Sequence, residues 1–196
     1  MSDKLFTSEI QALLSDPLPA RDWGYIVIHH SASHDGRTYE WDGIRKYHTS
    51  YRYRGEILTP EAAQQFISQG ISGVIPPWRD IGYHLGIEQR GYGYVYLKGR
   101  PLSEVGAHSG TDVSKKFNEE GIGICLLGNY DFDILKELQI KMLKELVNVL
   151  MEQFGIPIEK VIGHREVYSL LGILQLKSCP GNLIDLDQLR NKIKED

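Results

Sequence analysis

Histidines at the ends of apolar segments are the first residues in this sequence that could carry chemistry. His29 and His30 follow the apolar residues 25–28, and His164 follows the short apolar stretch 161–163. A catalytic zinc site needs three N, S or O ligands from the protein and one open position. Taken singly, a histidine at a strand end is more often a structural hydrogen-bonding residue than a ligand. Because neighbouring strand residues point to opposite faces, at most one of His29 and His30 can face a given site.

The segment Leu176-Lys177-Ser178-Cys179-Pro180-Gly181 adds a sulfur atom to this set. If the segment is extended, Lys177 and Cys179 lie on the same face. A lysine beside a thiol favours the thiolate, which is the form that binds metal. The alternative interpretation is a loop with an exposed lysine and an ordinary buried cysteine, and the segment alone favours that alternative.

The elements that would position these side chains alternate along the chain. Apolar or β-branched stretches predict strands over residues 25–28, 83–88, 94–97 and 121–127. A turn at 89–93 makes the second and third of these a hairpin. Helical spacing and capping predict helices over residues 4–16, 42–48 (capped by Asp42), 60–69, 135–154 and 186–193. We therefore expect one α/β domain over residues 1–196, with a central mixed sheet flanked by helices.

The composition excludes several classes of protein. The chain has 196 residues, 41% of them apolar and 24% charged, and a net charge of −4, which indicates a globular protein without a nucleic-acid or membrane partner. It has no apolar stretch of about 18 residues, and its start lacks a signal-peptide pattern, so we expect a cytoplasmic protein. The two cysteines, Cys125 and Cys179, are too few for a disulfide scaffold.

Six motifs in order resemble the zinc-dependent N-acetylmuramoyl-L-alanine amidases, the family of phage lysozyme-type amidases and peptidoglycan recognition proteins. The match runs from about residue 23 to residue 182. The motifs are Ile28-His29-His30-Ser31-Ala32, Ile81-Gly82-Tyr83-His84, Gly106-Ala107-His108, Gly121-Ile122-Gly123-Ile124-Cys125-Leu126-Leu127-Gly128-Asn129, Gly163-His164-Arg165-Glu166 and Lys177-Ser178-Cys179-Pro180-Gly181. The resemblance implies an amidase-like α/β fold and hydrolysis of the amide between N-acetylmuramic acid and L-alanine, in peptidoglycan or soluble muropeptides.

The resemblance also implies a metal and its ligands. His29, His164 and Cys179 match the three zinc ligands of the family. Zinc lowers the pKa of a bound water to roughly 7, which supplies a nucleophile at neutral pH. Only the resemblance chooses His29 over His30.

Further residues are expected to help the reaction or to bind substrate. Tyr83 matches the tyrosine that sits over the metal-bound water, Lys177 matches the lysine that stabilises the oxyanion, and His108 matches a segment that lines the substrate groove. Arg54 and Trp78 are expected to contact stem-peptide carboxylates or sugar rings, because arginine binds carboxylates and aromatic rings stack. The alternative for Arg54 is a surface flap without a specific role.

The sequence departs from the family pattern at several points. Residues 1–22 are expected to form an N-terminal helical extension, and residues 50–77 an insertion. Fourteen residues separate His164 from Cys179, and within them the apolar stretch 168–174 predicts a short helix. Cys125 takes the place of a catalytic glutamate in the recycling branch, and we expect it to be a buried core residue.

Two functions of different kinds fit this set of residues. The first is a zinc amidase, and the second is a module on the same fold that binds peptidoglycan or muropeptide without cutting it. The complete ligand set with Tyr83 and Lys177 favours the enzyme. A zinc hydrolase for a different amide stays open. We expect a monomer that either acts on imported wall fragments in the cytoplasm or is released to the cell wall by a separate lysis system.

Overall fold

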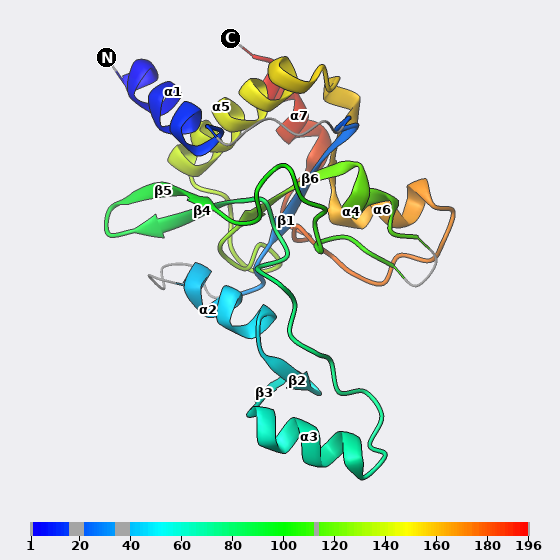
Figure 1. Cartoon of the computed structure of the whole chain (residues 1–196). Helices are drawn as coiled ribbons and strands as arrows, with labels where there is room; N and C mark the ends of the chain where they lie inside the picture. Colours follow the sequence, from blue (N-terminus) through cyan, green and yellow to red (C-terminus); the bar gives the residue numbers. More distant parts are fainter. Residues whose placement is uncertain (1, 16–21, 34–39, 112–113, 196) are drawn as a thin grey trace.

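A mixed five-stranded sheet lies at the centre of the computed structural model, which describes residues 2–15, 22–33, 40–111 and 114–195 (Figure 1). The strand order is β5-β4-β6-β1-β7. The strands are β1 (Tyr25–His30), β4 (Leu85–Arg90), β5 (Gly93–Lys98), β6 (Gly121–Leu126) and β7 (Val161–Gly163). All neighbours are parallel except β4 and β5, which form the expected hairpin. His29, near the end of β1, therefore lies beside His164, which directly follows β7.

One face of the sheet packs against the long helix α5 (Glu137–Phe154), with α1 (Ser2–Leu13) and α7 (Leu186–Lys194) beside it (Figure 1). The fully buried Ile26 and Ile28 of β1 belong to the same core as Leu146 of α5. The helix ends where Gly155 takes a left-handed conformation with φ 64°, which glycine adopts without the steric cost of a side chain.

The opposite face of the sheet carries the shorter helices α2 (Glu40–His48), α4 (Lys116–Glu119) and α6 (His164–Leu170). Tyr25 and Val27 of β1 pack there with Phe117. Because side chains alternate along β1, His29 shares this face with Val27, while His30 lies on the α5 face. The His30 ring accepts the backbone amide of Tyr130, which belongs to the core shared with α5, so the two histidines face opposite sides of the sheet, as expected.

A small lobe projects from the body at the lower part of Figure 1, formed by β2 (Tyr51–Tyr53), β3 (Glu56–Leu58) and α3 (Pro60–Ser68). The hydroxyl of Thr59 accepts a hydrogen bond from the amide of Ala62 and so caps α3. The lobe is attached through Arg52, whose guanidinium lies 4.5 Å from the centre of the Trp78 ring. The lobe coincides with the expected insertion at 50–77, which stays a prediction.

The fold confirms a single α/β domain with a central mixed sheet, and the differences from expectation are local. The helix expected over 42–48 begins at Glu40, because the buried carboxylate of Glu88 accepts the amide of Trp41 and caps the helix from a distant strand. Asp42 therefore lies inside the first turn. The helix expected over 168–174 occupies 164–170 instead.

The other elements add detail that the pattern could not show. A 3-10 turn, η1 (Ile158–Lys160), precedes β7. The first helix, expected over residues 4–16, ends at Leu13, and residues 14 and 15 are not helical, while residue 16, Pro17 and Pro19 lie outside the described residues. No helix within the described ranges is both long and apolar enough to cross a membrane.

Candidate metal centre

Three side chains from separate parts of the chain converge at the carboxyl edge of the parallel strands. His29 comes from β1, His164 opens α6 immediately after β7, and Cys179 comes from the loop that precedes α7. Their ligand atoms all lie within 4.8 Å of one another, and His29 Nδ1 is 3.6 Å from Cys179 Sγ. The exposed fractions of the three residues are 1%, 5% and 8%. Within the part of the chain that the structure describes, this is the only such group of three.

The chemistry of these donors fits zinc. His164 Nε2 is buried without a hydrogen-bond partner, which is costly unless the atom binds something else. Burial lowers the pKa of His29 well below its ordinary value and that of His164 to about 4, so both rings are neutral, as metal ligands must be. Two nitrogens and one sulfur with room for a fourth ligand match the donor sets of catalytic zinc sites.

The surroundings of Cys179 decide whether its thiol is ionised. Burial raises the pKa of the Cys179 thiol to about 12, although the backbone amide of His30, 3.4 Å from Sγ, opposes this. The positive charges of Lys177 and Arg165 also lower this pKa, but burial outweighs them, so in the absence of a bound metal the thiol keeps its proton at neutral pH. Binding of a metal must release that proton, as is usual for cysteine ligands.

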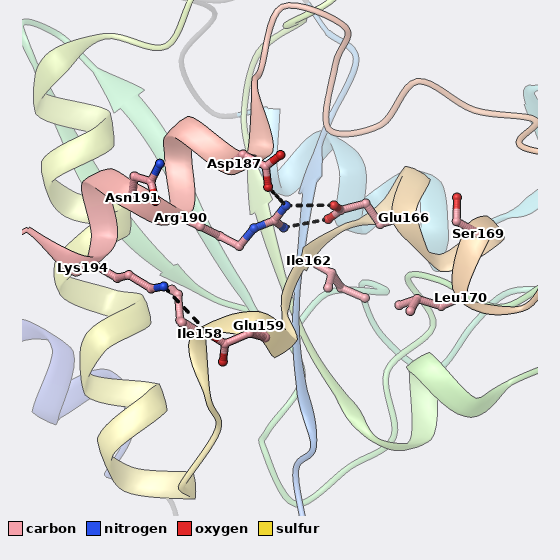
Figure 2. A pocket seen from close by; sticks show the side chains of 10 residues that line it. All are labelled: Ile158, Glu159, Ile162, Glu166, Ser169, Leu170, Asp187, Arg190, Asn191 and Lys194. Atoms are coloured by element: carbon pink, nitrogen blue, oxygen red, sulfur yellow. Dashed lines mark hydrogen bonds and ion pairs between the residues drawn. The ribbon is translucent and has the colours of Figure 1, made fainter.

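The position of His164 is fixed by an ion pair between α6 and α7 (Figure 2). Glu166 accepts the backbone amide of Gly163 at 2.8 Å, and both of its oxygens accept from Arg190 at 3.0 Å. Arg190 also donates to the carbonyl of Val161 in β7. The pair thus joins α7 to the end of β7 and to the first turn of α6, where His164 begins.

The loop that carries Cys179 is held by Arg165, the residue after His164. The Arg165 backbone amide donates to the Cys179 carbonyl at 2.6 Å, and its guanidinium donates to the carbonyls of Ser178, Gly181 and Ile184. These bonds tie the cysteine to the histidine in spite of the fourteen residues between them.

A cavity of about 500 Å³ opens over the three donors. Tyr83 lies in its wall, with its ring centre 5.2 Å from that of His29, and Lys177 stands exposed at the rim. Burial raises the pKa of the Tyr83 phenol well above its ordinary value, with the neighbouring Cys125 thiol as a further cause. Cys125 itself is fully buried.

Most of the residues singled out from the sequence line this cavity. Those present are His29, Tyr83, Trp78, His108, His164, Lys177 and Cys179. Arg54 is placed elsewhere, exposed in the β2–β3 turn of the lobe with its guanidinium 5.1 Å from the centre of the Tyr53 ring. Its substrate contact stays a prediction. His108 is 8% exposed and lies behind His29, where both ring nitrogens have partners.

Other residues at the site were not singled out from the sequence. Asp131 and His48 also line the cavity, and Asp131 accepts hydrogen bonds from the Ser178 hydroxyl and the Asn182 amide at 2.8 Å. Asp131 follows β6 at the same edge of the sheet, a place where ligand-binding residues gather, and this signal could have identified it. His48 ends a helix and lacks such a signal.

A second cavity, of about 670 Å³, lies between α6, α7 and η1, and is the one drawn in Figure 2. Arg190 projects across it between the carboxylates of Glu166 and Asp187. Because the charged groups in view pair with one another, we regard this cavity as part of the support for His164.

The fold and the site define an α/β protein with a buried His-His-Cys centre of the kind that zinc occupies. Residues 19–182 match the family described as N-acetylmuramoyl-L-alanine amidase, and the chain belongs to this family. The resemblance inferred from the six motifs is therefore confirmed.

Curated relatives and solved structures agree with this membership. The chain is 30% identical over 109 residues to an N-acetylmuramoyl-L-alanine amidase of Mus musculus and 31% identical over 110 residues to peptidoglycan-recognition protein LB of Drosophila melanogaster. These alignments span 55% and 53% of this chain but only 18% and 39% of the relatives' own length.

Two solved structures show the same fold at lower identity. The amidase LysC from Clostridium intestinale superposes with a TM-score of 0.54 at 20% identity, over 90% of this chain and 88% of that one. Bumblebee PGRP-SA superposes with a TM-score of 0.58 at 22% identity, over 89% and 83%.

Proposed function

We propose that this protein is a zinc-dependent hydrolase that cleaves the amide between N-acetylmuramic acid and L-alanine in peptidoglycan or muropeptides. The observation that carries the proposal is the complete, buried set of His29, His164 and Cys179 at the floor of an open cavity. Membership of the amidase family supplies the substrate class.

The residues around the centre suit the hydrolysis of an amide. A zinc ion held by the three donors would supply a nucleophilic water at neutral pH and polarise the carbonyl. Lys177 at the rim would place its ammonium beside the carbonyl oxygen and stabilise the negative charge that develops there. Because its pKa is raised, the Tyr83 phenol keeps its proton and acts as a hydrogen-bond donor rather than as a base.

The cavity edge offers a surface for the rest of the substrate. The Trp78 ring lies 4.6 Å from the His48 ring and covers the Arg52 guanidinium on the side of the lobe. We propose that Trp78 contacts a sugar ring or the stem peptide, since aromatic rings offer flat apolar area of this kind.

The second candidate function is binding of muropeptide without cleavage. It is favoured by the peptidoglycan-recognition proteins among the relatives. Both functions use the same cavity, so they differ in turnover and not in the place of binding. The complete donor set together with Lys177 favours the enzyme.

The test measures zinc and turnover on the same purified protein. We expect about one zinc per chain by elemental analysis and release of L-alanine amino termini from peptidoglycan or muropeptides, lost with a chelator and restored by zinc. The variant Cys179→Ala should lose both metal and activity. Absence of zinc after reconstitution would overturn the proposal, and bound zinc with muropeptide binding but no release would establish the binding module instead.

A further inference from the structure

His108 is joined to a proposed metal ligand through a chain of buried hydrogen bonds. His29 Nε2 lies 3.0 Å from His108 Nδ1, and His108 Nε2 lies 3.0 Å from the carbonyl oxygen of Gly121. His29 is 1% exposed and His108 is 8% exposed, so water does not compete for these bonds. This series of hydrogen bonds starts at the Gly121 carbonyl in β6 and ends at the candidate metal centre.

The direction of each hydrogen bond follows from the carbonyl. Because the Gly121 oxygen can only accept, His108 Nε2 must carry a proton. A neutral imidazole carries its proton on only one of its two ring nitrogens. His108 Nδ1 is therefore an acceptor, and His29 Nε2 must donate to it. His29 Nδ1 is left bare, 3.6 Å from the Cys179 sulfur and facing the position of the metal.

Two glycines leave room for the His108 ring. A Cβ atom added to Gly123 on β6, or to Gly106 on the preceding loop, would lie closer than 3.0 Å to ring atoms of His108. Real Cβ atoms essentially never approach so closely. Both glycines therefore lie close to the Cδ2 and Nε2 atoms of the ring, and a side chain at either position would push the ring out of its place beside His29.

We propose that His108 is a positioning residue that fixes the tautomer and the orientation of His29, so that Nδ1 of His29 is the atom offered to the metal. The proposal rests on the zinc site of the proposed function and deepens it. It differs from the role in substrate binding expected from the sequence, because both ring nitrogens of His108 are engaged inside the protein. Partners of this kind hold ligand histidines in zinc sites and raise their affinity for metal.

The first test reads the tautomer directly. In nitrogen-15 NMR spectra of the metal-free protein at neutral pH, we expect the proton of His29 on Nε2 and that of His108 also on Nε2. A proton on Nδ1 of His29 would overturn the proposal. This measurement needs no zinc, so it is decided separately from the proposed function.

The second test compares two substitutions of different chemistry. His108→Asn keeps an acceptor near the position of Nδ1, whereas His108→Leu fills the space without one. We expect His108→Leu to weaken zinc binding by about 10- to 100-fold in a chelator competition, and His108→Asn to restore most of the affinity. Zinc affinity unchanged in His108→Leu, or equally poor in both variants, would overturn the proposal. If His108→Leu does not fold, the tautomer measurement decides.

Discussion

Lys177 stands at the rim of the cavity with an exposed side chain, two residues before Cys179. If its ammonium stabilises the developing oxyanion, Lys177→Ala should lower kcat by about 10²- to 10³-fold, the usual cost of one such donor. The zinc content should not change, because the three donors stay in place. Amino-terminus release and elemental analysis on the same preparation measure both quantities. Lys192→Ala on the exposed side of α7 is the matched control, and full activity in Lys177→Ala would remove Lys177 from the reaction.

A substitution at Gly123 tests how tightly the His108 ring is packed. Gly123→Ala places a methyl group against the His108 ring, so we expect a loss of about 1–3 kcal/mol in the free energy of unfolding, together with weaker zinc binding. Gly93→Ala in β5 is the control, because a Cβ there meets nothing within 4 Å. Denaturant titration and chelator competition measure the two effects. A Gly123→Ala protein as stable as the control would show that the ring has room to move.

The choice between His29 and His30 shows where sequence reasoning stops at the scale of a residue. Alternation along β1 requires the two side chains to face opposite sides, and this could be predicted. Which side receives the loop that carries Cys179 depends on packing between segments 150 residues apart in the chain. Family resemblance supplied that choice, and the structure places His29 with Cys179.

At the scale of the elements, the joint between α6 and α7 supports His164. Glu166→Ala removes the acceptor of the Gly163 amide and leaves Arg190, a largely buried side chain, without its bidentate partner. We expect a loss of about 1–3 kcal/mol in the free energy of unfolding, since the buried amide of Gly163 then lacks its side-chain acceptor. Thermal or denaturant unfolding measures it.

The control for this prediction is an exposed ion pair between α7 and η1. Lys194 lies 3.8 Å from Glu159, with side chains 55% and 72% exposed, and such pairs contribute little. Lys194→Ala should therefore leave stability almost unchanged. Equal effects of the two substitutions would mean that the joint with Glu166 is no stronger than a surface contact.

Helix ends were the least predictable part of the elements for a physical reason. The cap of α2 comes from Glu88, a side chain on β4 more than forty residues away, so local capping residues gave the wrong start. The strands β2 and β3 have three residues each, too few to show alternation. By contrast, the periodicity of α5 and its glycine stop are local, and both could be predicted within two residues.

At the scale of the whole molecule, the order of the six motifs along the sequence predicts both the sheet and the site. The parallel strands β1, β6 and β7 bring segments that are far apart in sequence to one edge, which is why ordered motifs predict a site that spacing alone does not. The positions of the lobe and of the loop that carries Cys179 could not be predicted from the order of motifs. The lobe depends on the contact of Arg52 with the Trp78 ring, and the loop depends on the hydrogen bond of Arg165 to the Gly181 carbonyl.

The stability of the whole protein should fall in mild acid, and His48 offers a way to measure one contribution. Burial lowers the pKa of His48 from 6.5 to about 4, with Arg52 and Arg100 as further causes, and its Nδ1 accepts the amide of Gly82. Between these two pH values the unfolded chain binds more protons than the folded one. The contribution of His48 is therefore complete above pH 6.5 and is lost as the pH falls towards 4.

His48→Asn keeps an acceptor for Gly82 but cannot take up a proton in this range. In the metal-free protein we expect its free energy of unfolding to fall less steeply between pH 6.5 and 4 than that of the unaltered protein, by at most about 1.4 kcal/mol per pH unit. Denaturant titrations at several pH values give both slopes. The other buried histidines titrate in both proteins and cancel in the comparison, so parallel slopes would mean that His48 is protonated in the folded state as easily as in the unfolded chain.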